Sequence, residues 1–203
     1  DAILRRPRAS IEHVLRGTGV DVNMTNTLGQ TLLYCAADQG RAECVLALFT
    51  RADIAVNLCN AGGSPPLFAA IARNHHACLE VLLTHPFVNV NATNAKGCTA
   101  LHVAASIGDT TSLKLLLAHP RVDVNATDTA GRVPLHIAVN MGRCGCVELL
   151  LARADVDVNA NGIACYTPLH CAIARKQYTC AELLLAHADI DVNITDMNDQ
   201  VCL

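Results

Sequence analysis

Apolar residues gather in short clusters whose spacing fits helices with one buried face. In SLKLLLAHP (112–120), Leu113, Leu116 and Leu117 fall on one face, whereas Lys114 points elsewhere. A second kind of cluster, GCTALHVAA (97–105), precedes it, and a Val-x-Val-Asn stretch follows it. This order predicts a unit made of a helix, a turn, a second helix and an extended loop.

The same pattern recurs at a fixed spacing. Gly29, Gly63, Gly97 and Gly131 follow one another at intervals of 34 residues, which indicates an architecture of stacked repeats. Five complete units are predicted, covering 29–62, 63–96, 97–130, 131–164 and 165–198. Residues 1–28 supply part of an earlier unit and 199–203 begin another, so residues 1–203 are expected to form a single repeat domain.

Residues at the helix ends fit this division. Thr31, Thr99 and Thr167 are placed to cap the first helix of a unit with a hydroxyl group. Pro134 and Pro168 suit the first turn of that helix, where a missing N–H costs nothing. A left-handed residue is predicted to end the helix, and it is glycine in three units (Gly40, Gly108 and Gly142) but Asn74 or Lys176 in two others.

The repeated tetrapeptides carry a family resemblance. TALH (99–102), VPLH (133–136) and TPLH (167–170), with the LLL runs and the recurring DVNAT or DVNAN, resemble ankyrin repeats from about residue 8 to the C-terminus. The resemblance implies an all-α ankyrin-repeat solenoid of helix-turn-helix units with extended hairpin-like loops. Departures are an extra loop residue, Tyr34 and Phe68 at the family histidine, and Pro65 and Val133 at the capping threonine.

Composition and charge exclude several classes of partner. The chain is 52% hydrophobic but only 3% aromatic, and its net charge is −3 from 15 basic and 18 acidic residues. A protein that binds the nucleic-acid backbone needs a basic surface, so no nucleic-acid partner is expected. No apolar run reaches the 18 residues of a spanning helix, so we expect no membrane partner. We also expect the protein to be a monomer and to reside in the cytoplasm or the nucleus.

The eleven cysteines raise the question of a metal or redox site, above all in RCGCVELLLAR (143–153). Stepping by 34 residues from Cys146 leads to Cys44, Cys78, Ser112 and Cys180, so these residues form one structural column on the face between repeats. Cys144 belongs to a different column and points in another direction. We therefore expect packing rather than metal binding, with no cofactor, no metal and a reducing compartment.

The recurring histidines and asparagines also fit structural roles. The resemblance implies that His102 and His170 bond to the capping threonine and nearby backbone, whereas His136 lacks that threonine. His85, His119 and His187 are expected to act as cations or donors toward the carbonyl groups that end the second helix. The loop asparagines Asn57, Asn91, Asn125, Asn159 and Asn193 are expected to bond backbone groups; the resemblance also implies that they are candidate hydroxylation sites.

No catalytic set stands apart from the repeats, so no enzymatic activity of this chain's own is expected. The resemblance implies a concave surface that binds a protein or peptide. Its exposed positions become apolar and basic toward the C-terminal half, which predicts a partner with apolar anchors and some acidic character. The candidate residues are Arg73, Lys96, Ile107, Arg132, Asn140, Met141, Ile163, Tyr166 and Arg175.

Three functions remain open on the sequence. A scaffold that binds a partner protein through the concave face is the first. The second is a substrate-recruiting module of a larger enzyme or effector, such as a ligase adaptor or host-targeted effector, because the array opens and closes within a unit. The third is a structural spacer, which would bind no partner.

Overall fold

The computed structural model describes residues 21–162, 166–195 and 201. The chain divides into two compact units, residues 1–95 and 96–203. The described part of the chain contains ten helices and no sheet. The fold is all-α, as the resemblance implies.

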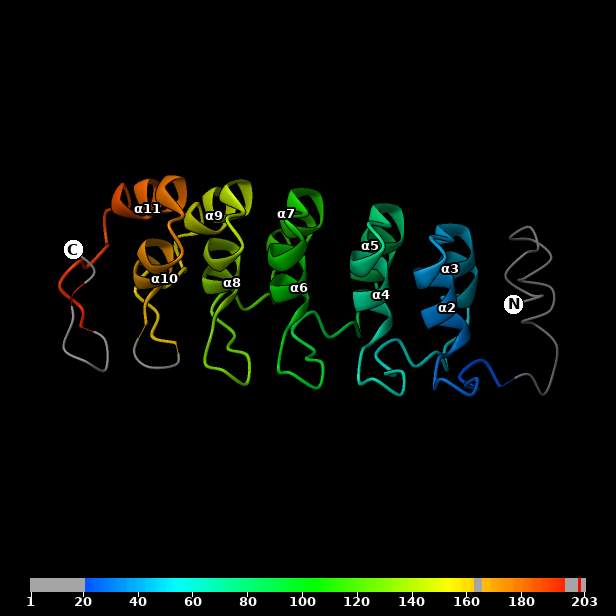
Figure 1. The fold of residues 1–203 in the computed structure, drawn as a ribbon. Helices are drawn as coiled ribbons and strands as arrows, with labels where there is room; N and C mark the ends of the chain where they lie inside the picture. Colours follow the sequence, from blue (N-terminus) through cyan, green and yellow to red (C-terminus); the bar gives the residue numbers. More distant parts are fainter. Residues whose placement is uncertain (1–20, 163–165, 196–200, 202–203) are drawn as a thin grey trace. The chain divides into compact units, whose positions relative to one another are not determined.

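The described part of unit 1, residues 21–95, contains two helix pairs (Figure 1). The second repeat consists of α4 (Pro66–Ala72) and α5 (His76–Leu83), and the first of α2 (Leu32–Asp38) and α3 (Ala42–Leu48). Helix α2 packs on α4, and α3 packs on α5. The first helices therefore form one layer and the second helices form the other.

Unit 2 repeats this arrangement three times. Its first helices are α6 (Ala100–Ile107), α8 (Pro134–Asn140) and α10 (Pro168–Ala174), and they pack in that order. Its second helices are α7 (Thr110–Leu117), α9 (Cys144–Leu151) and α11 (Tyr178–Leu185), which pack in the same order. The loops extend from one end of the pairs, away from α7 and α9 (Figure 1).

The helix ends confirm the predicted caps. The Thr31 hydroxyl accepts a hydrogen bond from the N–H of Tyr34 at 3.1 Å. Gly40, Gly108 and Gly142 have positive φ angles of 71°, 86° and 63°. Asn74 and Lys176 adopt the same left-handed conformation with φ of 56° and 58°. The backbone thus keeps its turn where the sequence does not supply glycine, at a conformational cost to the side chain.

The core is made of small and aliphatic side chains. Leu82, Leu116 and Leu150 occupy one position in three successive repeats, and all three are fully buried. The predicted cysteine column is also buried, since Cys44, Cys78, Cys146 and Cys180 are at most 4% exposed. Ser112 takes this place in α7, and its buried hydroxyl has no hydrogen-bond partner in the described part of the chain. The column therefore serves packing, as predicted.

The loop asparagines connect consecutive repeats. Asn57 donates from its amide to the carbonyl of Phe87 at 2.7 Å and accepts from the N–H of Asn89 at 2.8 Å. Asn125 makes the equivalent pair of bonds with Asp155 and Asp157. Each side chain thus satisfies one backbone acceptor and one donor in the next repeat, as predicted.

The histidines at the end of the second helices behave differently from the prediction. Nδ1 of His85, His119 and His187 accepts the N–H of the residue two positions later, at 3.3 Å in each case. Burial lowers the pKa of His85 and His119. The expectation of a cation or donor to the helix carbonyls was wrong, because the sharp turn that follows brings a backbone N–H onto the ring nitrogen.

Candidate functional site

The first helices of unit 2 end in exposed apolar residues. Ile107 is the last residue of α6 and is 38% exposed. Met141 follows α8 and is 48% exposed. They occupy the same position in successive repeats, and neither belongs to the core. Both predicted apolar anchors are therefore available to a partner.

A cavity of about 380 Å³ lies in the same unit, and its lining comes from the third, fourth and fifth repeats. It is lined by Ala130, Arg132, His136, Asn140, Gly162, Tyr166, Cys171, Ala174 and Arg175. Four of the predicted site residues, Arg132, Asn140, Tyr166 and Arg175, are brought together here. No carboxylate side chain is part of this lining.

Gly162 explains part of the opening. In the loops of other repeats, the residue at this position carries a side chain that folds back on the loop. The Oδ1 atom of Asn60 accepts from the N–H groups of Gly62 and Ser64, and Asp128 does the same for Ala130 and Arg132. A Cβ atom on Gly162 would come within 3.2 Å of Nε2 of His136. The missing side chain leaves the cavity wall open beside that ring.

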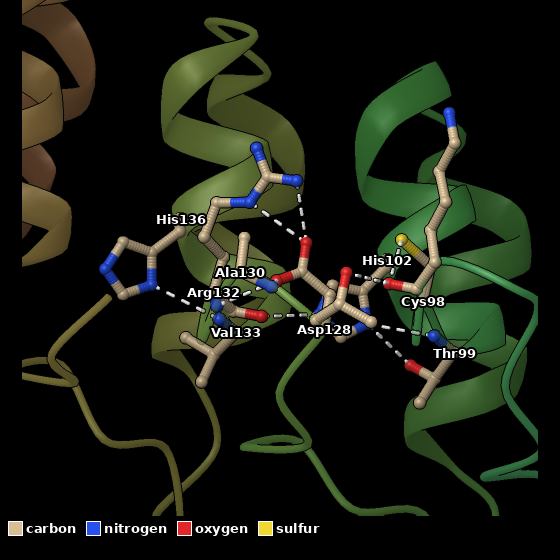
Figure 2. A network of polar contacts seen from close by, with 10 residues as sticks. Cys98, Thr99, His102, Asp128, Ala130, Arg132, Val133 and His136 are labelled. Atoms are coloured by element: carbon tan, nitrogen blue, oxygen red, sulfur yellow. Dashed lines mark hydrogen bonds and ion pairs between the residues drawn. The ribbon is translucent and has the colours of Figure 1, made fainter. Parts of the chain in front are cut away.

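Arg132 of the cavity lining is held by Asp128, which is not itself part of the lining (Figure 2). The Oδ2 atom of Asp128 accepts from Nε and Nη2 of Arg132 at 2.9 and 2.7 Å. The Asp128 side chain is 1% exposed, whereas that of Arg132 is 44% exposed. Burial alone would raise the pKa of Asp128, but hydrogen bonds from Arg132 and Ala130 outweigh it and lower the pKa. The carboxylate is therefore hidden beneath the guanidinium group.

His102 and His136 each bond the loop of the next repeat, which carries Arg132 in one case and Tyr166 in the other. Nε2 of His102 lies 2.8 Å from the carbonyl of Arg132, and Nε2 of His136 lies 2.9 Å from that of Tyr166. Nδ1 of His102 accepts the N–H of Thr99 at 3.1 Å, so the neutral Nε2–H tautomer fits both bonds. Burial is the main cause that lowers the pKa of both rings. A neutral histidine in the first helix of one repeat thus holds the loop of the next repeat in place.

The remaining predicted residues have other surroundings. Arg73 belongs to unit 1, where its Nε lies 3.2 Å from Oδ1 of Asp38. The carbonyl of Lys96 accepts from the N–H and the hydroxyl of Thr129, both at 3.0 Å. The Tyr166 ring is half-buried and stands edge-on to His170 at 5.6 Å. Ile163 lies outside the described residues.

Sequence reasoning missed two residues of the cavity lining, His136 and Gly162, and the ion pair that holds Arg132 there. His136 was given a structural role, and Gly162 and Asp128 were given none. The 34-residue register could have found Gly162, because it replaces an Asp or Asn of the other loops. The ion pair between Asp128 and Arg132 could also have been read from their spacing across a tight turn.

The arrangement favours binding over chemistry. Within the described residues, no group of three His, Cys, Asp or Glu side chains could hold a metal ion. Burial raises the pKa of Cys146 and of Cys98, which disfavours the nucleophilic thiolate form. No helix in the described part is long and apolar enough to span a bilayer.

Comparison with known families agrees with the geometry. Residues 2–94 and 84–162 match the family described as Ankyrin repeats (3 copies), and residues 165–197 match Ankyrin repeat. The chain belongs to the ankyrin repeat family. Ankyrin repeat domains are generally protein-binding modules, and they are typically non-catalytic. None of the curated proteins compared with it matches.

Two solved ankyrin structures are similar over most of their length. The ankyrin repeat domain of Bcl-3, described as a unique member of the IkappaB protein family, is 25% identical with a TM-score of 0.90; the match covers 99% of this chain and 90% of that one. The ankyrin repeat protein EF0377 is 26% identical with a TM-score of 0.82, over 92% of this chain and 95% of that one.

Proposed function

We propose that this ankyrin domain binds a protein segment across repeats three to five of unit 2. The observation that carries the proposal is the cavity between α8 and α10, whose lining holds two arginines and no carboxylate. The segment has apolar anchors and an acidic residue. The same surface would serve either a scaffold or a recruiting module of a larger enzyme or effector.

Charge supports an acidic residue in the partner. Arg132 uses Nε and Nη2 on Asp128 and keeps Nη1 for a further bond. The Arg175 side chain is exposed at the cavity, and among the described residues it has no ion-pair partner. Because the Asp128 carboxylate is buried under Arg132, a carboxylate entering the cavity meets two guanidinium groups first.

Apolar contacts support the rest of the segment. Met141 and Ile107 stand one repeat apart on the same side of unit 2, and packed helices are spaced by about 10 Å. That spacing fits successive anchors of an extended or helical segment. Interface centres favour Met, Tyr and Arg, which are the residue types gathered here.

Selection from a random-peptide display library, with the purified domain as bait, tests the proposal. We expect enriched peptides to combine an acidic residue with apolar ones. Binding of those peptides should fall at least ~10-fold in the variant carrying Met141→Glu and Ile107→Glu, because an unpaired buried charge is costly. A second variant, Arg175→Glu, should weaken the acidic peptides specifically.

A matched control carries Lys114→Glu and Glu148→Lys on the exposed sides of α7 and α9. These changes should leave peptide binding and the melting temperature unchanged. Peptides that bind the Met141 and Ile107 variant as tightly as the wild type, but lose affinity in the control, would place the functional surface on the second helices and refute the proposal.

A further inference from the structure

Two cysteine side chains of neighbouring repeats touch in unit 2. Sγ of Cys144, at the start of α9, lies 3.3 Å from Sγ of Cys180 in α11, 36 residues away in the sequence. Cys144 is half-buried, whereas Cys180 is fully buried. The Cys144 thiol is thus accessible to a small solute, whereas the Cys180 thiol is in contact with Cys144 but shielded from solvent.

The repeat register shows why the pair occurs here. A residue at the start of one second helix faces the buried column position of the next repeat. The equivalent pair one repeat earlier is Thr110 and Cys146, and in unit 1 it is Ala42 and Cys78. Within the described residues, both places hold cysteine at Cys144 and Cys180 alone. Packing needs one small side chain in the column and does not require the second thiol.

We propose that Cys144 and Cys180 are a redox modification site, at which a hydroperoxide forms a disulfide that joins the fourth and fifth repeats. The two sulfur atoms, 3.3 Å apart, are already nearer than the roughly 3.5–4.0 Å at which carbon atoms pack in van der Waals contact. A disulfide of about 2.05 Å needs a further approach of little more than 1 Å. The proposal is independent of the partner-binding function.

The chemistry is balanced by the peroxide. The Cys144 thiolate attacks one peroxide oxygen, the O–O bond breaks, and the departing hydroxide takes a proton to become water. The sulfur of Cys180 then attacks the sulfenic sulfur of Cys144, the S–O bond breaks, and the thiol proton of Cys180 passes to the departing oxygen, which leaves as a second water. Two thiols are oxidised by two electrons, and one hydrogen peroxide is reduced to two waters.

The surroundings assign the order of events. Burial, together with the contact to Cys144, raises the pKa of Cys180 to about 12, so Cys180 is the less reactive thiol toward peroxide and Cys144 reacts first. Other column cysteines are less suited to begin the reaction. Cys44 and Cys78 influence each other electrostatically, but both are buried, at 4% and 1% exposure.

The reduced domain treated with hydrogen peroxide provides the test. We expect the intact mass to fall by about 2 Da, and peptide mapping after alkylation to show a Cys144–Cys180 cross-link. The loss should be absent in Cys144→Ser and in Cys180→Ala, whereas Cys171→Ser should still show it. Oxidation should raise the melting temperature of the wild type, and dithiothreitol should reverse the rise. The Cys180→Ala variant should show no such shift.

A gain-of-function variant uses the same register. Thr110→Cys should create a second peroxide-dependent cross-link, to Cys146, because it restores the two-thiol contact one repeat earlier. The proposal is overturned if Cys144 and Cys180 remain fully alkylated in the folded wild type at peroxide doses that oxidise the exposed Cys59. It is also overturned if Cys144 pairs with the other cysteines as often as with Cys180.

Discussion

The two units begin their first helices with different side chains at the same position. Unit 2 has His102 and His136, each of which reaches a backbone carbonyl of the following repeat. Unit 1 has Tyr34 and Phe68, and Phe68 is 5% exposed within an apolar environment. The stacked helices accommodate either set of side chains, but of these four only the histidines titrate near pH 5 to 7.

The loops differ in the same way. In unit 1, Oδ1 of the neutral Asn60 side chain accepts from two backbone N–H groups of its loop. In unit 2, Asp128 makes the same two bonds and adds the ion pair with Arg132. Unit 2 therefore uses charge where unit 1 uses neutral contacts, and the cavity lies beside those charges.

The largest expected effect tests whether the two units are equivalent in their cores. Leu82→Ala in unit 1 and Leu150→Ala in unit 2 truncate fully buried side chains at the same repeat position. Each should reduce the free energy of unfolding by about 2–5 kcal/mol, as measured by urea denaturation. A loss under about 1 kcal/mol at either site would show that its unit packs differently from the other.

The second prediction tests the histidine difference. The pKa of His136 is lowered from its ordinary value of 6.5, mainly by burial. Its stabilising effect is complete above pH 6.5 and is lost as the pH falls below that value, because the unfolded chain then binds a proton that the folded ring does not. His136→Phe should cost about 1–3 kcal/mol at neutral pH. It leaves the buried N–H of Val133 without its Nδ1 acceptor, and the carbonyl of Tyr166 keeps only its bond from the N–H of Gly162.

The same variant should also weaken the dependence of stability on pH between 7 and 5, measured by urea denaturation at each pH. Phe68→His in unit 1 provides the contrast. The residue at the helix cap there is Pro65, which has no N–H to donate to the ring. That variant should be destabilised at every pH. An unchanged pH profile in His136→Phe would contradict the assignment.

Much of the fold was readable from the sequence because each repeat supplies its own boundary signals. Thr31, Gly108 and Pro134 act through their nearest neighbours, so their roles follow from local pattern alone. The cavity was harder to predict from the sequence. It depends on an absent side chain at Gly162 and on the burial of Asp128 beneath Arg132, and both are visible only when consecutive loops are placed together.

The cysteines show the same limit. The 34-residue register correctly placed Cys146 and Cys180 in a buried column. It did not reveal that Cys144 faces Cys180, because this contact runs between two columns offset by two residues. Contacts across repeats depend on the stagger of neighbouring helices, which a one-dimensional alignment of the units does not contain.

The third prediction compares the loop side chains directly. Asp128→Asn gives unit 2 the side-chain type of Asn60 in unit 1. It keeps an acceptor for two N–H groups but loses the charge opposite Arg132, which is 44% exposed. The loss should be about 1 kcal/mol, because solvent screens a partly exposed pair.

Acid titration sharpens this comparison. The pKa of Asp128 is lowered from 3.8, so its stabilising effect is present above pH 3.8 and is lost as the pH falls through the lowered pKa. Asp128→Asn should remove that part of the acid sensitivity, measured by urea denaturation below pH 4. A variant that is as acid-sensitive as the wild type would show that the ion pair contributes nothing to folding.

The smallest expected effect concerns the turn between the two helices of a repeat. Lys176 in unit 2 and Asn74 in unit 1 both adopt a left-handed backbone, with φ of 58° and 56°. Asparagine tolerates this conformation better than lysine does. Lys176→Gly should therefore raise the free energy of unfolding by about 0.5–1 kcal/mol, and Asn74→Gly by only a few tenths, because glycine loses more entropy on folding. Thermal denaturation monitored by circular dichroism measures both. An equal gain at the two sites would mean that the asparagine side chain does not relieve the strain, and that the two units share the same defect.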